Sequence, residues 1–504
     1  MSLGVYVIEG KKGKLKELCK REGIPVTENP EDSTVIFAED VGEDEAEWNL
    51  LRKLTGEGRT FISSHSTSAY LLLKLVPISS ANRTITFEKG EETKRIWPFR
   101  VIKAIQPYDI MVSPYGKGKI VSLPFDISEN LSNLENCSMY YPSLEGELLG
   151  LAPKVGKGEM RRLIVNYIKS AFLERGLPFI RLRHGPGKKI NWFGFKVDVD
   201  EMSSDELRKI WNIAIEKNIS ISFFIAVRPN TELLPLLKEM QEQGQDIQLR
   251  CYETSSHFDY NRDREDLIKG IEALKSAGIF VKGVSASGGK WCFELSHLYE
   301  EFGLIYTSDI NCSVNDLPFY PSHRGKTSKV IQVPVEAFSI ELLVKSGLGE
   351  KEIKKLLPWI AKQHQKIAEP VFMSGYSGDR KYENYVEMYS EVMELFNATG
   401  YQNINLTDYA DWWKKREKTQ CVFNSFNNEE LTVTVENSAA EQFLDVFLPD
   451  GSKRIVEAKS GTYRLDTLTE IVDEADFLEY GNAGKSLPSF TDKLKQKWGA
   501  FFGK

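Results

Sequence analysis

A regular succession of apolar strands and amphipathic helices begins at Trp192 and constrains the fold of this chain more than any other feature. The apolar stretch FGFKVDV is followed by the helical pattern SSDELRKIWNIAIEKN, and ISISFFIAV is followed by TELLPLLKEMQEQG. DIQLRCY and VKGVSAS begin two further units of the same kind. Each unit has about 25–35 residues, the size of a strand–helix crossover. We therefore expect an α/β fold in which residues 191–417 form a (β/α) barrel of parallel strands.

The segments on either side of this repetition have other patterns. Residues 1–145 alternate β-like and helical stretches, such as GVYVIEG, KGKLKELCKREG and STVIFAED, which predicts a small doubly wound α/β domain. A helical linker is expected over residues 146–190, ending at the break around Gly185. Residues 418–480 have short alternating stretches and a turn at Asp450, so we expect a small β-sandwich there.

The layout of residues 1–145 resembles flavodoxin-like and glutamine-amidotransferase-like domains. Such amidotransferases carry a nucleophilic cysteine on a tight turn between a strand and a helix. The corresponding stretch here, FISSHSTSAY, has Ser64, His65 and Ser66 but no cysteine. A serine and a histidine that are adjacent in sequence do not by themselves make a nucleophile and base pair, so we expect these residues to have structural roles.

The charge and composition of the chain exclude some functions. The formal net charge is −7, which gives no general attraction to nucleic acid. The apolar start ends at Ile8, too early for a signal-peptide core, and no run of about 18 apolar residues occurs. The six cysteines are scattered without a Cys-x-x-Cys pair. We expect a cytoplasmic protein with reduced thiols.

The chain ends in a stretch with an amphipathic helical pattern. Over residues 481–504, aromatic residues such as Trp498 share one helical face and lysines surround them. Such a helix docks on its own protein, binds a partner or lies on a membrane surface, and the pattern leaves these alternatives open.

The first strand of the expected barrel ends in two carboxylates, Asp198 and Asp200. The alternation of a strand points both side chains inward, at the end of the barrel where chemistry is expected. Two carboxylates this close suggest a general base beside a metal ligand. They also fit an acidic turn before the next helix, for which Ser203, Ser204 and Asp205 are N-cap candidates.

Residues 190–415 resemble the polysaccharide deacetylase (NodB-homology) family in the order of their motifs. FKVDVDE resembles the first family motif, GQDIQLRCYET the histidine-bearing strand, and GVSASGGKWCFELSHLYEEFGLIYTSDI a later motif with its helix, with LTDYADWW at the end. The resemblance implies a deacetylase-type barrel and metal-dependent hydrolysis of an acetyl group on a sugar. It assigns Asp198 the role of the base and Asp200 that of a metal ligand.

The chain departs from the family at its metal site. Arg250 and Thr254 stand where the resemblance places two histidine ligands, and arginine has no lone pair to donate to a metal. Ser285 and Gly288 replace two residues of the later motif, and EPVFMSGYSGD lacks the late histidine. His257 follows Arg250 closely enough to swing back, and together with Asp198, Asp200 and Glu253 it would suit magnesium or manganese.

These observations support three hypotheses. In the first, the protein is a non-catalytic carbohydrate-binding or scaffolding protein without a cofactor, in which Arg250 pairs with Asp198 or Asp200 and lines a cleft with Tyr252, Trp291 and Tyr320. In the second, it is an active deacetylase or related hydrolase of non-peptide C–N bonds, with a divalent metal held by Asp200 and His257. In the third, it is a structural subunit of a membrane-associated or multi-protein assembly. Packing at the start of a helix is an equally good interpretation of Trp291.

Overall fold

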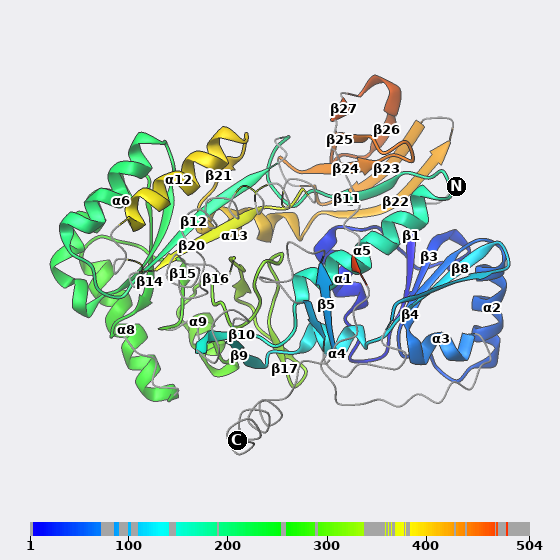
Figure 1. The fold of residues 1–504 in the computed structure, drawn as a ribbon, viewed down its shortest axis with the longest axis horizontal. Coiled ribbons are helices and arrows are strands. Elements are labelled where there is room, and N and C mark those ends of the chain that lie inside the picture. The colour runs from blue at the N-terminus through cyan, green and yellow to red at the C-terminus, as the bar shows by residue number, and fades with distance from the viewer. Residues whose placement is uncertain are drawn as a thin grey trace, which may run out of the picture.

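The computed structural model describes residues 4–71, 85–89, 99–101, 109–140, 148–188, 191–253, 259–287, 291–336, 358, 361, 364, 368–376, 379, 384–427, 430–438, 441–468, 470–471 and 480–481. Figure 1 shows a unit of strands and helices from the middle of the chain at one end of the molecule and the N-terminal sheet at the other. The small antiparallel sheets from the C-terminal part lie beside the N-terminal sheet. The α/β class predicted from the sequence is confirmed.

The first part of the chain is built on a six-stranded sheet in the order β2-β1-β3-β4-β8-β7. The strands run parallel except β7, which pairs antiparallel with β8. Helix α1 ends at Gly23, whose φ of 71° is readily adopted only by glycine. The elements are β1 (Gly4–Ile8), α1 (Leu15–Glu22), β2 (Val26–Thr27), η1 (Pro30–Asp32), β3 (Ser33–Ala38), α2 (Glu45–Gly56), β4 (Thr60–Ser64), α3 (His65–Leu71), β7 (Met111–Tyr115), β8 (Gly118–Leu123) and α4 (Ile127–Ser132).

Two smaller sheets accompany this part of the chain. Strands β9 (Asn136–Tyr140) and β10 (Leu148–Pro153) form an antiparallel hairpin. Strands β5 (Ile85–Lys89) and β6 (Phe99–Val101) pair with each other, and β28 (Tyr480–Gly481), near the end of the chain, adds to β5. The last described strand therefore returns to the N-terminal part of the chain.

Residues 146–190, predicted as a helical linker, also contribute strands to sheets that lie outside the barrel. Its helical portion is α5 (Lys157–Leu173), and it is followed by β11 (Phe179–Leu182). Strand β11 pairs antiparallel with β24, some 260 residues further along the chain. The description of residues 146–190 as a helical linker is therefore incomplete, because strand pairing over this sequence distance leaves no local pattern to read.

The central part of the chain forms an eight-stranded parallel sheet in the order β19-β16-β15-β14-β13-β12-β20, with β21 also pairing with β12. The elements are β12 (Trp192–Val199), α6 (Ser204–Glu216), β13 (Ile221–Ala226), η2 (Arg228–Leu233), α7 (Leu234–Glu242), β14 (Asp246–Cys251), α8 (Tyr260–Ser276), β15 (Gly283–Val284), α9 (Phe293–Glu301), β16 (Tyr306–Thr307), β17 (Ser322–His323), β18 (Lys326–Thr327), β19 (Ile331–Gln332), β20 (Val371–Tyr376), α12 (Tyr385–Ala398), β21 (Gln402–Asn403) and α13 (Leu406–Arg416). The predicted succession of parallel strands is confirmed.

The two outer strands of this sheet, β19 and β20, do not form a ladder within the described residues. The chain after β19 nevertheless reaches β20, because the backbone N–H of Glu336 donates to the carbonyl of Phe372 at 2.7 Å. The Ser374 hydroxyl also donates to the carbonyl of Glu336 at 3.1 Å. The sheet is therefore a half-barrel whose gap is bridged at one point.

Two antiparallel sheets make up the C-terminal part. One has the order β11-β24-β25-β27 and the other the order β22-β23-β26. Residues of β23, β24 and β25 share one apolar core with residues of β1, β3 and α5. This part therefore packs directly on the first. The elements are β22 (Gln420–Asn427), β23 (Glu430–Glu436), β24 (Phe443–Phe447), β25 (Lys453–Glu457), β26 (Gly461–Arg464), η5 (Leu465–Thr467) and β27 (Glu470–Ile471).

The predicted amphipathic helix of residues 481–504 lies outside the described residues except at its first position, and it stays a prediction. Among the described helices, none has the length and apolar character needed to cross a bilayer.

Candidate functional site

The two carboxylates predicted as a site lie where the sequence places them, at the carboxyl end of β12. Asp198 is the penultimate residue of this strand, and its side chain is 11% exposed. Asp200 follows the strand, and its side chain is 20% exposed. Ser203 caps the next helix and forms a reciprocal capping box with Glu206, which fixes where the loop ends and confirms Ser203 among the N-cap candidates.

The loop that carries Asp200 is held by a buried asparagine. The side-chain amide of Asn230, on η2, donates to the carbonyl of Asp200 at 3.1 Å. Its side-chain oxygen accepts from the backbone N–H of Met202, also at 3.1 Å. Asn230 is 1% exposed, so these bonds are shielded from water. They fix the backbone beneath the Asp200 carboxylate.

Arg250 lies between the two carboxylates. It is the penultimate residue of β14, and β13 separates this strand from β12. A guanidinium nitrogen is 2.8 Å from Oδ2 of Asp198, and Nε contacts Oδ1 of Asp200. The predicted pairing of Arg250 with these acids is therefore confirmed, and it involves both of them. The guanidinium also lies 5.9 Å from the ring centre of Tyr376 on β20.

A second buried cation, Lys196, completes this group. Its Nζ lies 3.1 Å from Oδ1 of Asp198 and donates to the Ser285 hydroxyl at 2.9 Å and to the Ser308 carbonyl at 2.7 Å. The sequence motifs did not single out this residue. The signal was present, because Lys196 stands two residues before Asp198 and strand alternation points both side chains to the same face.

Burial and charge act on these groups together. Burial lowers the pKa of Lys196, and Asp198 and Asp309 oppose that shift by favouring the ammonium form. Burial also acts to lower the pKa of Arg250, but Asp198 and Asp200 outweigh it, so this pKa lies above its ordinary value. Two cations face two carboxylates, so the charges of this group cancel without an added ion.

The floor of the group is a buried carboxyl, Asp309, just after β16. Its Oδ1 accepts from the backbone N–H of Ala286 at 2.6 Å, and the Thr307 hydroxyl donates to Oδ2. Burial raises the pKa of Asp309, although the hydrogen bond from Thr307 and the charge of Lys196 oppose this. We call Lys196, Asp198, Asp200 and Arg250 the charge cluster, with Asp309 below it.

The described residues of this site do not fit a divalent metal. A metal between Asp198 and Asp200 would occupy the volume that the Arg250 guanidinium fills, and a guanidinium repels a cation instead of binding it. Within the described ranges no group of three histidine, cysteine or acidic side chains is arranged to hold a metal ion. His257, the predicted alternative ligand, lies outside these ranges, so its role stays a prediction.

The structure does not gather the predicted aromatic side chains around Arg250. Trp291 is 7% exposed in the apolar core and packs edge-to-face with Phe293. This burial favours the alternative interpretation of Trp291 as packing at the start of a helix. The Tyr320 hydroxyl donates to Glu417 at 2.8 Å, and Tyr320 borders a small crevice at the first domain. Tyr252, which is half-buried and lies two residues after Arg250, keeps its predicted role as an expectation.

The serine and histidine residues of the first domain are placed in structural contacts. His65 Nδ1 is 2.5 Å from the Ser122 hydroxyl, and Nε2 is 3.0 Å from the Asp109 carbonyl. The Ser64 hydroxyl bonds to Ser66 at 2.9 Å. The histidine therefore holds β8 and its neighbouring loop, in agreement with the structural role expected from the sequence.

The comparisons with known proteins give structural matches alone. No family model and no curated protein matches this chain. A polysaccharide deacetylase structure from Mycobacterium smegmatis matches at 15% identity and a TM-score of 0.37, over 49% of this chain and 100% of that one. One from Pseudomonas aeruginosa PAO1 matches at 14% identity and a TM-score of 0.39, over 46% and 93%. A CE4 family pseudoenzyme from Bacillus anthracis matches at 16% identity and a TM-score of 0.30, over 46% and 68%. Any functional inference therefore rests on the residues of this chain.

Proposed function

We propose that this chain is a non-hydrolytic protein of the polysaccharide-deacetylase type, which binds carbohydrate or acts as a scaffold. The observation that carries the proposal is the position of Arg250 between Asp198 and Asp200. A metal-dependent deacetylase needs these carboxylates as base and ligand, and here both are engaged by a fixed cation.

The energetics of the charge cluster favour its persistence. The Arg250 side chain is 2% exposed, so releasing Asp200 would leave a buried guanidinium with less compensation. Breaking a buried pair by losing one partner costs roughly 3–5 kcal/mol. A divalent ion would also have to overcome the repulsion of Lys196, which is 1% exposed. The carboxylates are therefore poor ligands as long as both cations are present.

The binding role rests on the groups that remain at the strand ends. Asp200 is partly exposed, and the side chain of Tyr376 is half-buried beside Arg250. Carboxylates accept hydrogen bonds from sugar hydroxyls, and aromatic rings pack on sugar faces. The burial of Trp291 makes this surface smaller than the one predicted, which gives the scaffold role more weight than the sequence did.

The test measures metal and turnover on the same preparation. Elemental analysis of protein purified without chelator, a zinc and manganese titration, and a deacetylation assay on acetylated chito-oligosaccharide should all be negative. In Arg250→His, which removes the fixed cation and adds an imidazole, zinc affinity should rise. Arg264→His is the matched control, because Arg264 is 40% exposed and pairs with Glu301 instead of the cluster.

One stoichiometric metal in the unmodified protein, lost in Asp200→Ala and accompanied by turnover, would overturn the proposal. The protein would then be the metal-dependent hydrolase of the second hypothesis, and His257 would be the next residue to change.

A further inference from the structure

One segment of the barrel, residues 308–319, connects the charge cluster to the first domain. It follows β16 and returns along β19, where Phe319 and Gln332 exchange backbone hydrogen bonds of 2.8 and 3.1 Å. We call it the connecting segment. Its first residues touch the site, and its later residues touch elements from outside the barrel.

At the site, the connecting segment supplies the floor. The carbonyl of Ser308 accepts from Lys196, and the carboxyl of Asp309 accepts from the backbone N–H of Ala286. Asn311 is 6% exposed and accepts from the backbone N–H of Trp291 at 2.9 Å. Movement of the segment would therefore displace the carbonyl that holds the Lys196 ammonium.

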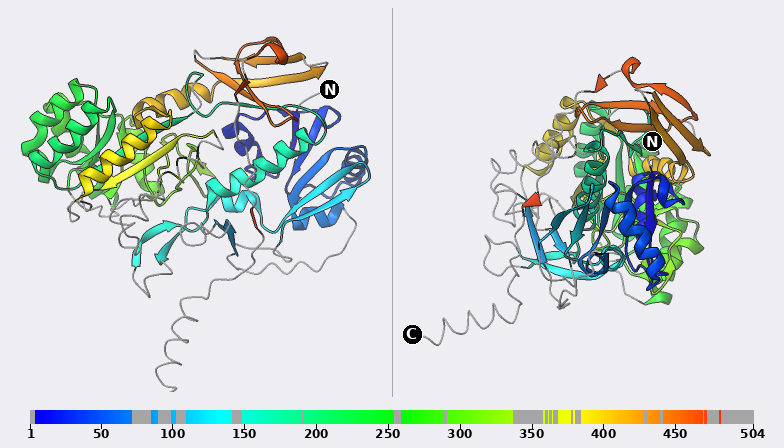
Figure 2. Two further views of the ribbon diagram at one scale, coloured as in Figure 1. Left: turned by 45° about the horizontal axis from the view of Figure 1, so that its top comes forward. Right: turned by 90° about the vertical axis from the view of Figure 1, so that its right-hand side faces the viewer.

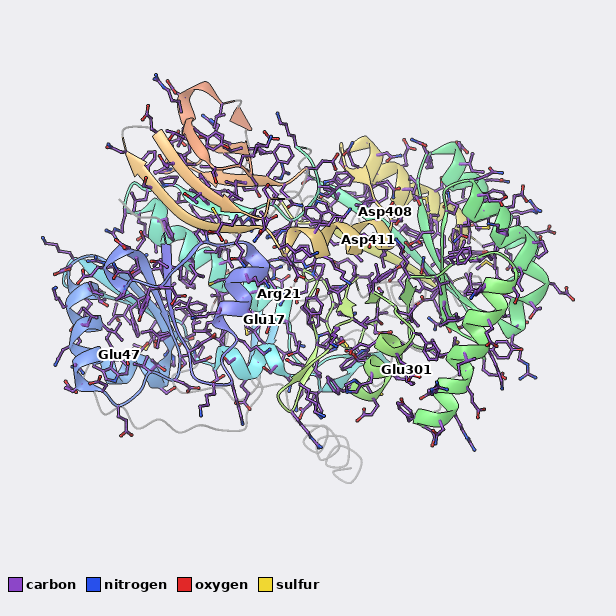
Figure 3. All side chains as sticks on the ribbon, turned by 180° about the vertical axis from the view of Figure 1, so that it is seen from behind. Glu17, Arg21, Glu47, Glu301, Asp408 and Asp411 are labelled. Carbon is purple, nitrogen blue, oxygen red and sulfur yellow. The ribbon has the colours of Figure 1, made fainter. Side chains whose placement is uncertain are left out.

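At its other end, the segment is held by an arginine of the first domain. Arg21, on α1, donates to the carbonyl of Leu317 at 2.7 Å and to that of Pro318 at 3.2 Å. It also lies 2.9 Å from Oδ1 of Asp316, whose side chain is fully buried. Burial raises the pKa of Asp316, but Arg21 and Arg161 outweigh it, so the pKa is lowered and the carboxylate stays charged. Figure 3 shows Arg21 where α1 meets the barrel.

Helix α5 holds the middle of the segment. Lys157 donates to the carbonyl of Cys312 at 3.1 Å, and Arg162 donates to the carbonyl of Asn315 at 2.9 Å. Gly158 allows this approach, because a Cβ atom there would lie 2.0 Å from the Asn315 carbonyl oxygen. Two elements outside the barrel, α1 and α5, therefore bind four residues of the segment: 312, 315, 316 and 317.

We propose that the first domain positions the barrel site through the connecting segment, with Arg21 as a positioning residue. A change at the α1 contact then alters the floor of the charge cluster. The inference rests on the proposed function in that it treats the charge cluster as the working site.

The test is hydrogen–deuterium exchange of the full-length protein without any ligand. Two amides report on the segment, those of Ala286 and Trp291, because each donates to one of its side chains. In Arg21→Met, the exchange of these two amides should accelerate about tenfold. This is the change expected when the free energy of local opening falls by the contribution of roughly one hydrogen bond. Amides of β12 should stay protected as in the unmodified protein.

Lys20→Met is the matched control, since Lys20 is the exposed neighbour on the same helix and loses the same charge. It should leave both amides unchanged. Arg21→Lys provides a milder variant if Arg21→Met does not fold. Unchanged exchange at Ala286 and Trp291, together with faster exchange over 312–319, would overturn the coupling. Because no metal or sugar is present, that result is distinct from a failure of the proposed function.

Discussion

At the residue scale, the barrel site differs from a metal site because cations of the chain neutralise its acids. Arg250 and Lys196 come from different strands and meet Asp198 on opposite oxygens, Oδ2 and Oδ1. A metal could leave or exchange, whereas covalently attached cations stay in place. With Arg250 between the two carboxylates, the site is therefore already neutral without a captured ion.

A second buried residue, His184, makes stability depend on pH. Burial, followed by the charge of Arg181, lowers its pKa from 6.5 to about 4, although Glu22 opposes the shift. The folded state thus holds neutral histidine, while the unfolded chain takes up a proton near pH 6.5. The contribution of His184 to the unfolding free energy is complete above pH 6.5. About 3 kcal/mol of unfolding free energy is lost as the pH falls towards 4, because the unfolded chain binds the proton more tightly.

We therefore expect urea unfolding at pH 7.5 and pH 4.5 to give a smaller difference in unfolding free energy for His184→Gln than for the unmodified protein. His297→Gln, at an exposed position on α9, is the control and should keep the original pH dependence. The lowered pKa of Glu22 produces a loss of the same sign, but at lower pH, so it does not obscure the comparison. An unchanged slope in His184→Gln would show that this histidine is not held neutral.

At the scale of elements, α5 joins the three regions of the molecule, which are the N-terminal part, the barrel and the C-terminal part. Its apolar face enters the core shared by the first and last regions, and its first turn lies against the connecting segment. Figure 2 shows this long helix running between the N-terminal sheet and the barrel. The helix is thus buried between regions on both sides. Its N-terminal turn contains buried charged residues because they bind the connecting segment there.

Gly158 tests the closeness of this contact. Gly158→Ala should destabilise the protein by at least about 1–3 kcal/mol, the usual cost of adding a methyl group to a packed interior, because its clash is with a backbone carbonyl. Gly42→Ala, where the new Cβ would meet nothing within 4 Å, should have little effect. Both values come from chemical denaturation. Equal effects at the two glycines would contradict the close approach.

At the scale of the whole molecule, a buried network of ion pairs links the three regions. Arg161 on α5 contacts Glu22 of α1, Asp316 of the connecting segment at 2.9 Å and Glu369 before β20 at 2.8 Å. Glu22 also pairs with Arg181 of β11 at 3.1 Å. A buried charge without a partner is unfavourable. Separating any one region from the others would therefore leave charged groups of this network unpaired and would lower the stability of the remaining regions.

We expect the three regions to unfold together, in one calorimetric transition. Arg161→Met leaves three carboxylates without one of their cations and should lower the unfolding free energy by roughly 3–5 kcal/mol, or split the transition in two. Arg264→Met, which removes an ion pair whose two side chains are each 40% exposed, is the control and should leave the unfolding free energy nearly unchanged. Two transitions in the unmodified protein would refute the single unit.

The sequence by itself determined the repeated strand and helix pattern, the place of Asp198 and Asp200 at a strand end, and the inability of Arg250 to bind a metal ion. These are local properties, since the period of apolar residues decides which face is buried and the residue type decides what it can bind. Even the pairing of Arg250 with the acids follows, because all parallel strands of one sheet have their carboxyl ends at the same edge.

The tertiary structure alone decided which surfaces meet. The pairing of β11 with β24, the burial of Trp291, the separate place of Tyr320 and the contacts of Arg21 with residues 316–318 all join positions far apart in the chain. A sequence pattern marks a face as apolar or charged without naming its partner. The partner is fixed only when complementary shapes and charges pack together, because long-range contacts carry the free energy that chooses between alternatives.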